Sequence, residues 1–230
     1  MLISGLEKMS LVDYDGFVSA TIFTGGCNFR CGFCHNSPLV LTYKDLPNIS
    51  ESEVLEYLKK RQGLLDGVCI SGGEPTLQKD LPDFIEKVKN LGYSVKLDTN
   101  GTNPELVKSL WESGLVDYFA TDIKADKETY PKIIGIDGYD LKNVEKTVDY
   151  FITNNVNHEL RTTLIKEFHT PTVIKNIGEW IKGAKKYFLQ KFIESENCIA
   201  HGFSEIPKDI AEEYKNFLTK FVPNTNLRGY

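Results

Sequence analysis

Apolar and polar residues alternate along this chain in a pattern that predicts short strands separated by amphipathic helices. Strands are expected at residues 17–23, 67–71, 94–99, 118–123, 158–165 and 187–193. Helices are expected at residues 50–62, 81–91, 104–113, 141–154, 171–181 and 207–221. Ser50 followed by Glu53 is a capping-box pattern at the first helix, and Gly92 and Gly114 follow two others. Residues 228–230 are expected to form a terminal strand or a frayed tail.

Six strands that alternate with helices predict a parallel α/β sheet with right-handed crossovers. Periodicity alone fits a flat doubly wound sheet and a curved partial barrel equally well. Polar clusters follow or lie on the first five strands, at residues 27–34, 71–76, 98–101, 122–124 and 161–163. Chemistry in parallel α/β folds collects at the carboxyl ends of strands, and five such clusters meet most easily if the sheet curls. We therefore expect a partial (β/α)6 TIM-like barrel of parallel strands.

Spacing along the strands places polar side chains in pairs. Residues two apart on a strand share one face, and this applies to three pairs: Asp98 with Asn100, Asp122 with Lys124, and Arg161 with Thr163. Charged groups that face the interior of a sheet are costly unless they meet a polar ligand or each other. The pattern predicts a polar ligand site, or internal ion pairs, at these strand ends.

Composition narrows the class of protein. A chain of 230 residues with 41% hydrophobic residues can form one large domain or two small ones. Because no low-complexity stretch or obvious linker is present, we expect a single domain over residues 1–230. The net charge is -5 and no basic block is present, which argues against a nucleic-acid partner. No apolar run approaches the roughly 20 residues that span a bilayer, and residues 1–8 lack a signal-peptide pattern. A cytoplasmic protein without membrane contact is expected.

Three cysteines, Cys27, Cys31 and Cys34, form a C-x3-C-x2-C run. Three thiolates can hold three corners of a [4Fe-4S] cluster and leave the fourth iron open to a ligand, whereas an electron-transfer cluster uses four. A structural zinc site that includes His35 is an alternative, but chelation by two adjacent residues is cramped. A disulfide framework is less favoured, because five cysteines are sparse in a chain of this length.

The remaining cysteines and histidines carry no metal or catalytic spacing. Cys69 lies in an apolar run and is expected to be a buried small hydrophobe, and no role is assigned to Cys198. His158, His169 and His201 are expected at the surface.

The cysteine run, with the aromatic Phe33 before its last cysteine, resembles the signature of the radical S-adenosylmethionine (SAM) superfamily. The resemblance implies a [4Fe-4S] cluster on the three cysteines with SAM at the open iron. The turn Gly72-Gly73-Glu74-Pro75 resembles the superfamily motif that meets the methionyl amine of SAM through backbone carbonyls and the carboxylate. Glycines suit this role because they let a ligand approach the backbone closely.

The same resemblance assigns further cofactor contacts. It places Asp98 and Asn100 near the ribose and methionine end of SAM, although residues 98–101 alone also fit an Asx turn. In the related pyruvate formate-lyase activating enzyme, residues matching Asp98, Thr99 and Asp122 help to hold a monovalent cation.

Two cationic residues complete the expected set. Lys124 is implied as a cofactor contact, and the alternative for Asp122 and Lys124 is a structural ion pair. Arg161 fits the arginine on the fifth strand of the family, and its alternative is pairing with a carboxylate.

Within the superfamily, the chain resembles most the enzymes that activate glycyl-radical enzymes, in particular those of anaerobic ribonucleoside-triphosphate reductase. The resemblance spans nearly the whole chain, and the matching segments are 10–16, 26–31, 34–36, 160–163 and 189–192. Two departures concern the protein-facing rim: Asp15 replaces a usual proline, and Ile199-Ala200-His201 replaces an expected acidic–proline pair.

The resemblance implies a reaction. A low-potential donor such as ferredoxin or flavodoxin reduces the cluster, SAM is cleaved, and the resulting radical removes a hydrogen atom from a glycine of a partner enzyme. The alternatives are a partner of the pyruvate formate-lyase type, or a small-molecule reaction like that of 7-carboxy-7-deazaguanine synthase. A non-enzymatic zinc or iron-sulfur protein is a distant alternative. The partner is expected to contact the rim that carries Asp15, residues 131–140 and His201.

Overall fold

The computed structural model describes all residues from Met1 to Tyr230. Its eight strands belong to one sheet, in which their order follows the chain from β1 to β8. Contacts within the chain divide it into two compact units. The first unit contains residues 1–28 and 36–119, and the second contains residues 29–35 and 120–230. Strand β5 (Tyr118–Asp122) begins in the first unit and ends in the second.

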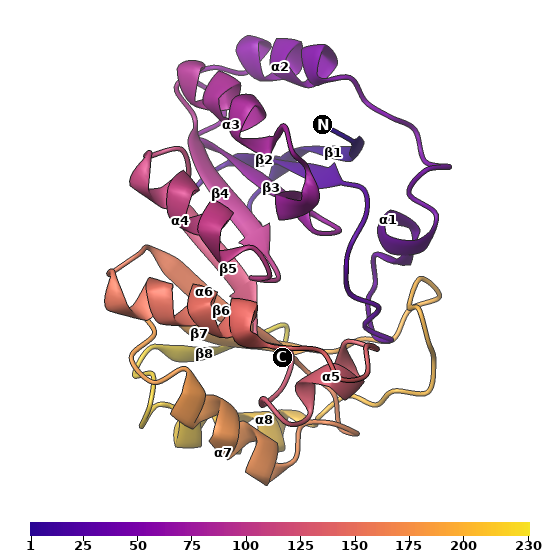
Figure 1. Ribbon diagram of the computed structural model, residues 1–230, viewed down its shortest axis with the longest axis vertical. Coiled ribbons are helices and arrows are strands. Elements are labelled where there is room, and N and C mark those ends of the chain that lie inside the picture. Colours follow the sequence, from indigo (N-terminus) through magenta and orange to yellow (C-terminus); the bar gives the residue numbers. More distant parts are fainter. The chain divides into compact units, whose positions relative to one another are not determined.

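The first unit builds four strands and the helices between them. The strands are β1 (Ile3–Ser10), β2 (Ser19–Thr24), β3 (Gly67–Gly72) and β4 (Ser94–Thr99). The helices are α1 (Ser37–Leu41), α2 (Glu51–Lys60), α3 (Leu81–Asn90) and α4 (Pro104–Glu112), with a 3-10 turn, η1, at Pro75–Leu77. β2, β3 and β4 pair in parallel, whereas β1 pairs antiparallel to β2. Helices α3 and α4 lie on the same side of these strands (Figure 1).

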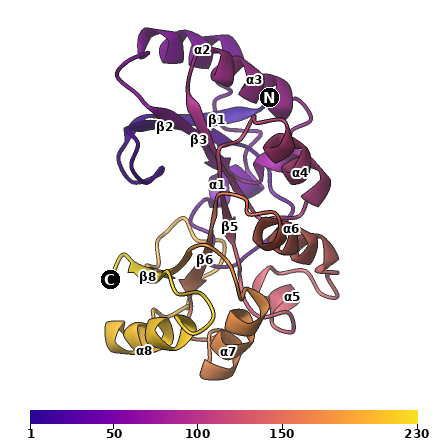
Figure 2. The same ribbon diagram turned by 90° about the vertical axis from the view of Figure 1, so that its left-hand side faces the viewer.

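The second unit repeats this strand–helix alternation. Its strands after β5 are β6 (His158–Leu164), β7 (Tyr187–Lys191) and β8 (Thr225–Arg228), and all three are parallel neighbours. Its helices are α5 (Tyr130–Ile133), α6 (Lys142–Thr153), α7 (Pro171–Trp180) and α8 (Lys208–Leu218). Helices α7 and α8 pack against each other beside β8 (Figure 2).

Side-chain caps fix where several helices begin. Ser50 Oγ accepts a hydrogen bond from Glu53 N at 3.2 Å, which confirms the capping pattern at α2. Thr170 Oγ1 accepts one from Val173 N at 3.4 Å, and Pro171 occupies the first helical position of α7. These caps set the lengths of the loops that return the chain to the next strand.

Strand β6 shows how the sheet separates an apolar face from a polar face. Leu160 and Leu164 are fully buried on one side, while Glu159 and Arg161 alternate with them on the other. Burial of apolar side chains stabilises the unit by roughly 25 cal/mol per Å². The polar face is left for the residues of the candidate site.

All six expected strands are present, with ends that differ by up to two residues from the predicted ranges. Strand β1 and helices α1 and α5 were not predicted, and β1 makes the sheet mostly rather than wholly parallel. The tail at 228–230 begins as the end of strand β8. None of the helices combines the length and apolar character needed to cross a lipid bilayer.

The expectation that the histidines lie at the surface is wrong for two of them. His158 and His169 are each only 1% exposed. The ring nitrogens of both pair with backbone groups, so a neutral imidazole can be buried without losing hydrogen bonds. His201 is exposed, as predicted.

Candidate active site

The turn after β3 lies directly against the backbone that leads into Cys27. Gly73 N donates to Thr24 O at 2.9 Å, and Glu74 N donates to Gly26 O at 2.8 Å. A Cβ atom on Gly73 would lie 2.0 Å from Gly26 O, so no larger residue fits there. The close approach expected of this Gly-Gly turn is therefore present, and it joins the turn to the end of β2.

The carboxylate of Glu74 is fully buried and accepts hydrogen bonds from other residues of the protein. Its Oε1 accepts from Thr76 Oγ1 at 2.5 Å and from Thr99 Oγ1 at 2.7 Å, and its Oε2 accepts from Asn100 N at 2.6 Å. Burial raises the pKa of Glu74, although these hydrogen bonds favour the charged form. Glu74 thus joins the glycine turn to the end of β4, and its contact with a cofactor stays a prediction.

The amide of Asn100 is also held from both sides. Its Nδ2 donates to Asn28 Oδ1 at 2.7 Å, and its Oδ1 accepts from Thr102 Oγ1 at 2.8 Å. Asn28 follows Cys27 directly, so the end of β4 is tied to the start of the cysteine loop. Asn28 and Thr102 were not singled out from the sequence.

Asp98 lies on the polar face of β4 and is 15% exposed. Its Oδ2 accepts from Ser71 Oγ at 3.2 Å, and its Oδ1 lies 3.4 Å from Lys96 Nζ. Cys69 Sγ lies 3.8 Å from the same oxygen, and the residue is buried as expected. Lys96, almost completely buried two residues before Asp98 on the same strand face, was not singled out from the sequence.

The cysteine loop enters the second unit after Asn28. Cys31 is buried, and Cys34 N donates to Cys31 O at 3.0 Å, which places these two residues in one tight turn. Cys27 belongs to the first unit, and the structure gathers no group of three metal-ligating side chains. None of the five cysteines forms a disulfide.

A segment after β7 holds this loop in place. Ala200 N donates to Gly32 O at 2.8 Å, and Cys198 Sγ lies 3.8 Å from Phe33 O. The ring of Phe203 leaves no room for a side chain at position 32, because a Cβ there would lie 3.0 Å from it. Cys198 therefore has a structural contact with the cysteine loop, which the sequence did not suggest.

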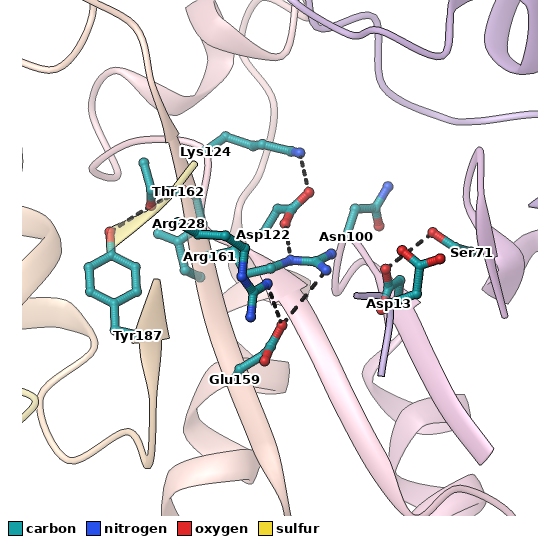
Figure 3. A network of polar contacts seen from close by, with 12 residues as sticks. Asp13, Ser71, Asn100, Asp122, Lys124, Glu159, Arg161, Thr162, Tyr187 and Arg228 are labelled. Atoms are coloured by element: carbon teal, nitrogen blue, oxygen red, sulfur yellow. Dashed lines mark hydrogen bonds and ion pairs between the residues drawn. The ribbon is translucent and has the colours of Figure 1, made fainter. Parts of the chain in front are cut away.

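Three charged side chains, two from the end of β5 and the residues after it and one from the middle of β6, form a connected set (Figure 3). Asp122 Oδ2 accepts from Lys124 Nζ at 2.7 Å, and Asp122 Oδ1 accepts from Arg161 Nε at 2.8 Å. The Lys124 ammonium lies 5.7 Å from the centre of the buried Phe33 ring. The ion pairs considered as alternatives for these residues are thus present, and they bring together the predicted contacts of this unit.

Electrostatics fix the charge state of this set. Burial disfavours the charged form of Asp122, but Arg161 and then Lys124 outweigh it and hold the pKa of Asp122 well below its usual range. Burial likewise opposes the charge on Lys124, but Asp122, followed by Cys31, raises the pKa of Lys124 well above its usual range. All three groups are charged at neutral pH.

The network continues to residues that sequence patterns did not single out. Glu159 is 1% exposed, and its Oε1 lies 3.9 Å from an Arg161 nitrogen and 3.2 Å from Arg228 NH1 (Figure 3). The guanidinium of Arg228 lies 3.9 Å from the centre of the Phe188 ring. Glu159 could have been predicted from the sequence, because it lies two residues before Arg161 on β6 and residues two apart share a face.

Residues 21–173 match the radical SAM superfamily. This match includes the cysteine loop, the glycine turn and the ends of β4, β5 and β6, and it draws on both compact units. The chain belongs to the radical SAM superfamily and is a radical SAM enzyme.

Two curated relatives extend this result. A protein of Methanocaldococcus jannaschii named "Putative glycyl-radical enzyme activating enzyme" is 33% identical over 99% of this chain and 95% of its own length. A Thermococcus kodakarensis protein named "Probable GTP 3',8-cyclase" is 32% identical over 55% of this chain and 42% of its own length.

Solved structures share the fold at low sequence identity. Streptococcus suis SuiB has a TM-score of 0.71 and 15% identity, over 89% of this chain and 47% of its own. A domain of pyruvate-formate lyase-activating enzyme from Bacteroides vulgatus has a TM-score of 0.59 and 16% identity, over 71% of this chain and 99% of its own. The chain thus spans about half the length of SuiB. These likenesses establish the radical SAM core fold, which is an open, mostly parallel α/β sheet of the partial-barrel type.

The residues present fit the cofactors that this superfamily implies. Three cysteines that form no disulfide belong to one short loop, as a [4Fe-4S] cluster with one open iron requires. The glycine turn exposes backbone beside that loop, and charged groups of both signs lie at the strand ends for a zwitterionic ligand.

Proposed function

We propose that this protein generates a glycyl radical on a partner enzyme, and that this partner is an anaerobic ribonucleoside-triphosphate reductase. The observation that carries the proposal is the end-to-end similarity to a relative named as a glycyl-radical enzyme activating enzyme, at 33% identity over 99% of this chain. Small-molecule radical enzymes such as the GTP 3',8-cyclase relative match only part of their length.

In this proposal Cys27, Cys31 and Cys34 hold the cluster. With the reduced cluster and SAM bound, the site would supply a 5'-deoxyadenosyl radical: one electron passed from the cluster to SAM would break a carbon–sulfur bond and leave methionine, and the radical would take one hydrogen atom from glycine. The Gly72-Gly73 backbone offers carbonyls to the methionyl amine.

The strand ends orient the rest of the cofactor. Asp98 and Asn100 face the ribose and methionine end, while Lys124 and Arg161 bring positive charge toward the SAM carboxylate. A monovalent cation beside Asp98, Thr99 and Asp122 is part of the proposal, and it would share the Asp122 carboxylate with two cationic side chains. Phe33 is buried and excludes water from the cluster side of the loop.

The proposed reaction needs two further proteins, the partner enzyme and an electron donor. A low-potential ferredoxin or flavodoxin in the cytoplasm is the proposed donor. The proposed docking rim carries Asp15 and His201, both exposed, and residues 131–140. The second candidate function is a small-molecule radical reaction, because the GTP 3',8-cyclase relative shares 32% identity over 55% of this chain.

The test is electron paramagnetic resonance on anaerobically reconstituted protein with SAM and a reductant, with and without the anaerobic ribonucleotide reductase of the same cell. A glycyl-radical doublet that needs both proteins is the expected result. Formation of 5'-deoxyadenosine without the doublet contradicts the partner and favours the second candidate. Absence of 5'-deoxyadenosine contradicts the whole proposal.

The Cys34→Ala variant is the control for the ligand assignment. It should load iron incompletely and produce no 5'-deoxyadenosine. A Cys69→Ala variant, which removes a buried thiol outside the loop, should keep full iron loading.

A further inference from the structure

The end of β5 is held by a row of buried side chains in the second unit. Each of three consecutive carbonyls accepts one hydrogen bond from a side chain: Asp122 O from Tyr130 Oη at 3.3 Å, Ile123 O from Thr162 Oγ1 at 2.6 Å, and Lys124 O from His169 Nε2 at 2.9 Å. The three donors come from α5, from β6 and from the loop after β6. We call Tyr130, Thr162 and His169 the carbonyl brace.

Hydrogen bonding settles the tautomer of His169. His169 Nδ1 lies 2.8 Å from Ile165 N, which can only donate, and 3.1 Å from Ile165 O, which can only accept. Nε2 lies 2.9 Å from Lys124 O, which needs a donor. A single ring proton on Nε2 satisfies the two shorter contacts, whereas a proton on Nδ1 would satisfy only the longest one. The ring proton is therefore on Nε2, which donates to Lys124 O. His169 is 1% exposed, and burial lowers its pKa, which favours this neutral form. The ring thus links the backbone at the end of β6 to the backbone of Lys124.

The direction of the Thr162 hydrogen bond follows in the same way. Ile123 O can only accept, so the Thr162 hydroxyl donates to it. The second bond of that hydroxyl, 2.6 Å from Tyr187 Oη, must then be donated by the tyrosine. Every hydrogen-bonding group in this part of the brace has a partner, which restricts the backbone to one position.

The residues that the brace fixes are those that carry Asp122 and Lys124. β5 ends at Asp122, so the carbonyls beyond it depend on side chains for their hydrogen bonds. Asp122 and Lys124 bond to each other at 2.7 Å across the braced Ile123. A shift of this backbone would move both charged groups at once.

We propose that His169 is a positioning residue, which acts with Thr162 and Tyr130 to hold Asp122 and Lys124 in the orientation that binds SAM. The inference rests on the proposed role of those two residues as SAM contacts. It deepens that role, because the three side chains of the brace bond to the backbone that carries Asp122 and Lys124. The ring acts through the backbone of Lys124.

A second buried histidine provides a matched control. His158 is also 1% exposed and lies at the opposite end of β6. Its Nδ1 lies 3.0 Å from Val156 O, its Nε2 accepts from Lys185 N at 3.3 Å, and burial lowers its pKa as well. Replacing either ring by leucine removes two backbone contacts from the same unit.

The experiment compares His169→Leu, His169→Gln and His158→Leu. Both leucine variants should lose similar stability, but only His169→Leu should raise the KM for SAM, by about tenfold for one lost charge-orienting hydrogen bond. The same variant should show about tenfold faster amide exchange in residues 122–126 of the metal-free protein. His169→Gln, which keeps a donor near the Nε2 position, should restore both values toward those of the unchanged protein.

The outcomes separate this inference from the proposed function. An equal rise of the KM and of the exchange in His158→Leu, or no change in His169→Leu, overturns the positioning role. If the unchanged protein forms no 5'-deoxyadenosine, the proposed function fails, while the exchange measurement still tests the brace.

A second variant covers the case in which His169→Leu does not fold. Thr162→Val keeps the shape of the side chain and removes the donor to Ile123 O, whereas Thr162→Ser keeps the hydroxyl. Faster exchange in residues 122–126 for the valine variant alone is expected, and equal exchange in both variants contradicts the brace.

Discussion

Glu159 carries the negative charge on which the polar face of β6 depends. It is almost completely buried, and two arginines, Arg161 and Arg228, lie within 3.9 Å of the same carboxylate oxygen. A buried ion pair adds little by itself, but removing one partner leaves the other charges uncompensated. Here Arg161 keeps its 2.8 Å ion pair with Asp122, so the cost of removing Glu159 comes from taking one shared carboxylate away from both guanidinium groups.

The Glu159→Ala variant should therefore lose about 3 kcal/mol of unfolding free energy, measured by urea denaturation. The matched control is Glu205→Ala, because Glu205 pairs with Lys191 at 2.9 Å but is 54% exposed. This exposed pair should contribute less than about 1 kcal/mol. Similar losses in both variants would contradict the buried role of Glu159.

Single residues differ in how far the sequence reveals them. Asp98, Asp122 and Arg161 were predictable because each shares a strand face with a second polar residue. His169 was not, because one polar residue in a loop has no periodicity, and its burial depends in part on the backbone of Lys124, 45 residues away. The charged residues Lys96 and Glu159 were missed as well.

At the scale of elements, the glycine turn after β3 joins two strands and the cysteine loop. Gly73 allows its backbone to lie against Gly26, and Glu74 extends the connection to the end of β4. The backbone at position 73 can hardly move away, because its N–H is bonded to Thr24 O.

The Gly73→Ala variant should lose well over about 2 kcal/mol of unfolding free energy, because overpacking against backbone cannot be relieved by a rotamer change. SAM binding should be lost with it. The control is Gly63→Ala, where nothing lies within 4 Å of the added Cβ and only the left-handed backbone is unfavourable. That cost is about 1 kcal/mol. Denaturant unfolding and SAM titration of both variants test this prediction. An equal loss of unfolding free energy in Gly73→Ala and Gly63→Ala would contradict the close approach of the two backbone segments.

The alternation of strands and helices was predictable because six strands are short apolar runs and most helices are amphipathic. Strand β1 was missed because three of its residues are exposed and its partner lies antiparallel at the edge. Helices α1 and α5 have only five and four residues, which is too short for a helical period to show.

At the scale of the whole molecule, titratable groups are distributed unevenly. All four histidines, His35, His158, His169 and His201, belong to the second unit. Burial lowers the pKa of His158 and of His169. In the first unit burial raises the pKa of Glu74, which has the opposite effect on stability as the pH falls.

Lowering the pH should therefore reduce the stability of the second unit before that of the first. A histidine whose folded pKa lies below its unfolded value of 6.5 contributes full stability above that pH and loses it as the pH falls toward the folded pKa. Each buried histidine should contribute a slope of up to about 1.4 kcal/mol per pH unit. Amide exchange at pH 7 and at about pH 5.5 tests this. Faster opening confined to residues 120–230 is expected, and uniform or first-unit opening would contradict it.

The sequence predicted the class of fold, because its strands are short apolar runs that alternate with amphipathic helices. The cofactor contacts assigned to the residues at the strand ends stay a prediction. It did not predict the division into two compact units, since that depends on contacts between residues far apart in the chain. A single functional domain over residues 1–230 stays a prediction.

The segment after β7 holds the cysteine loop through a backbone N–H and through side chains that face the loop. Ala200 contributes its N–H rather than its side chain, and Cys198 contacts the carbonyl of Phe33. The outward side chains of this segment, including Ile193 and His201, are largely exposed. Their identities can therefore drift during evolution while the cluster loop stays anchored. Because the outward side chains are separate from the groups that hold the loop, a family of enzymes could change the protein it recognises without changing the residues of the cysteine loop.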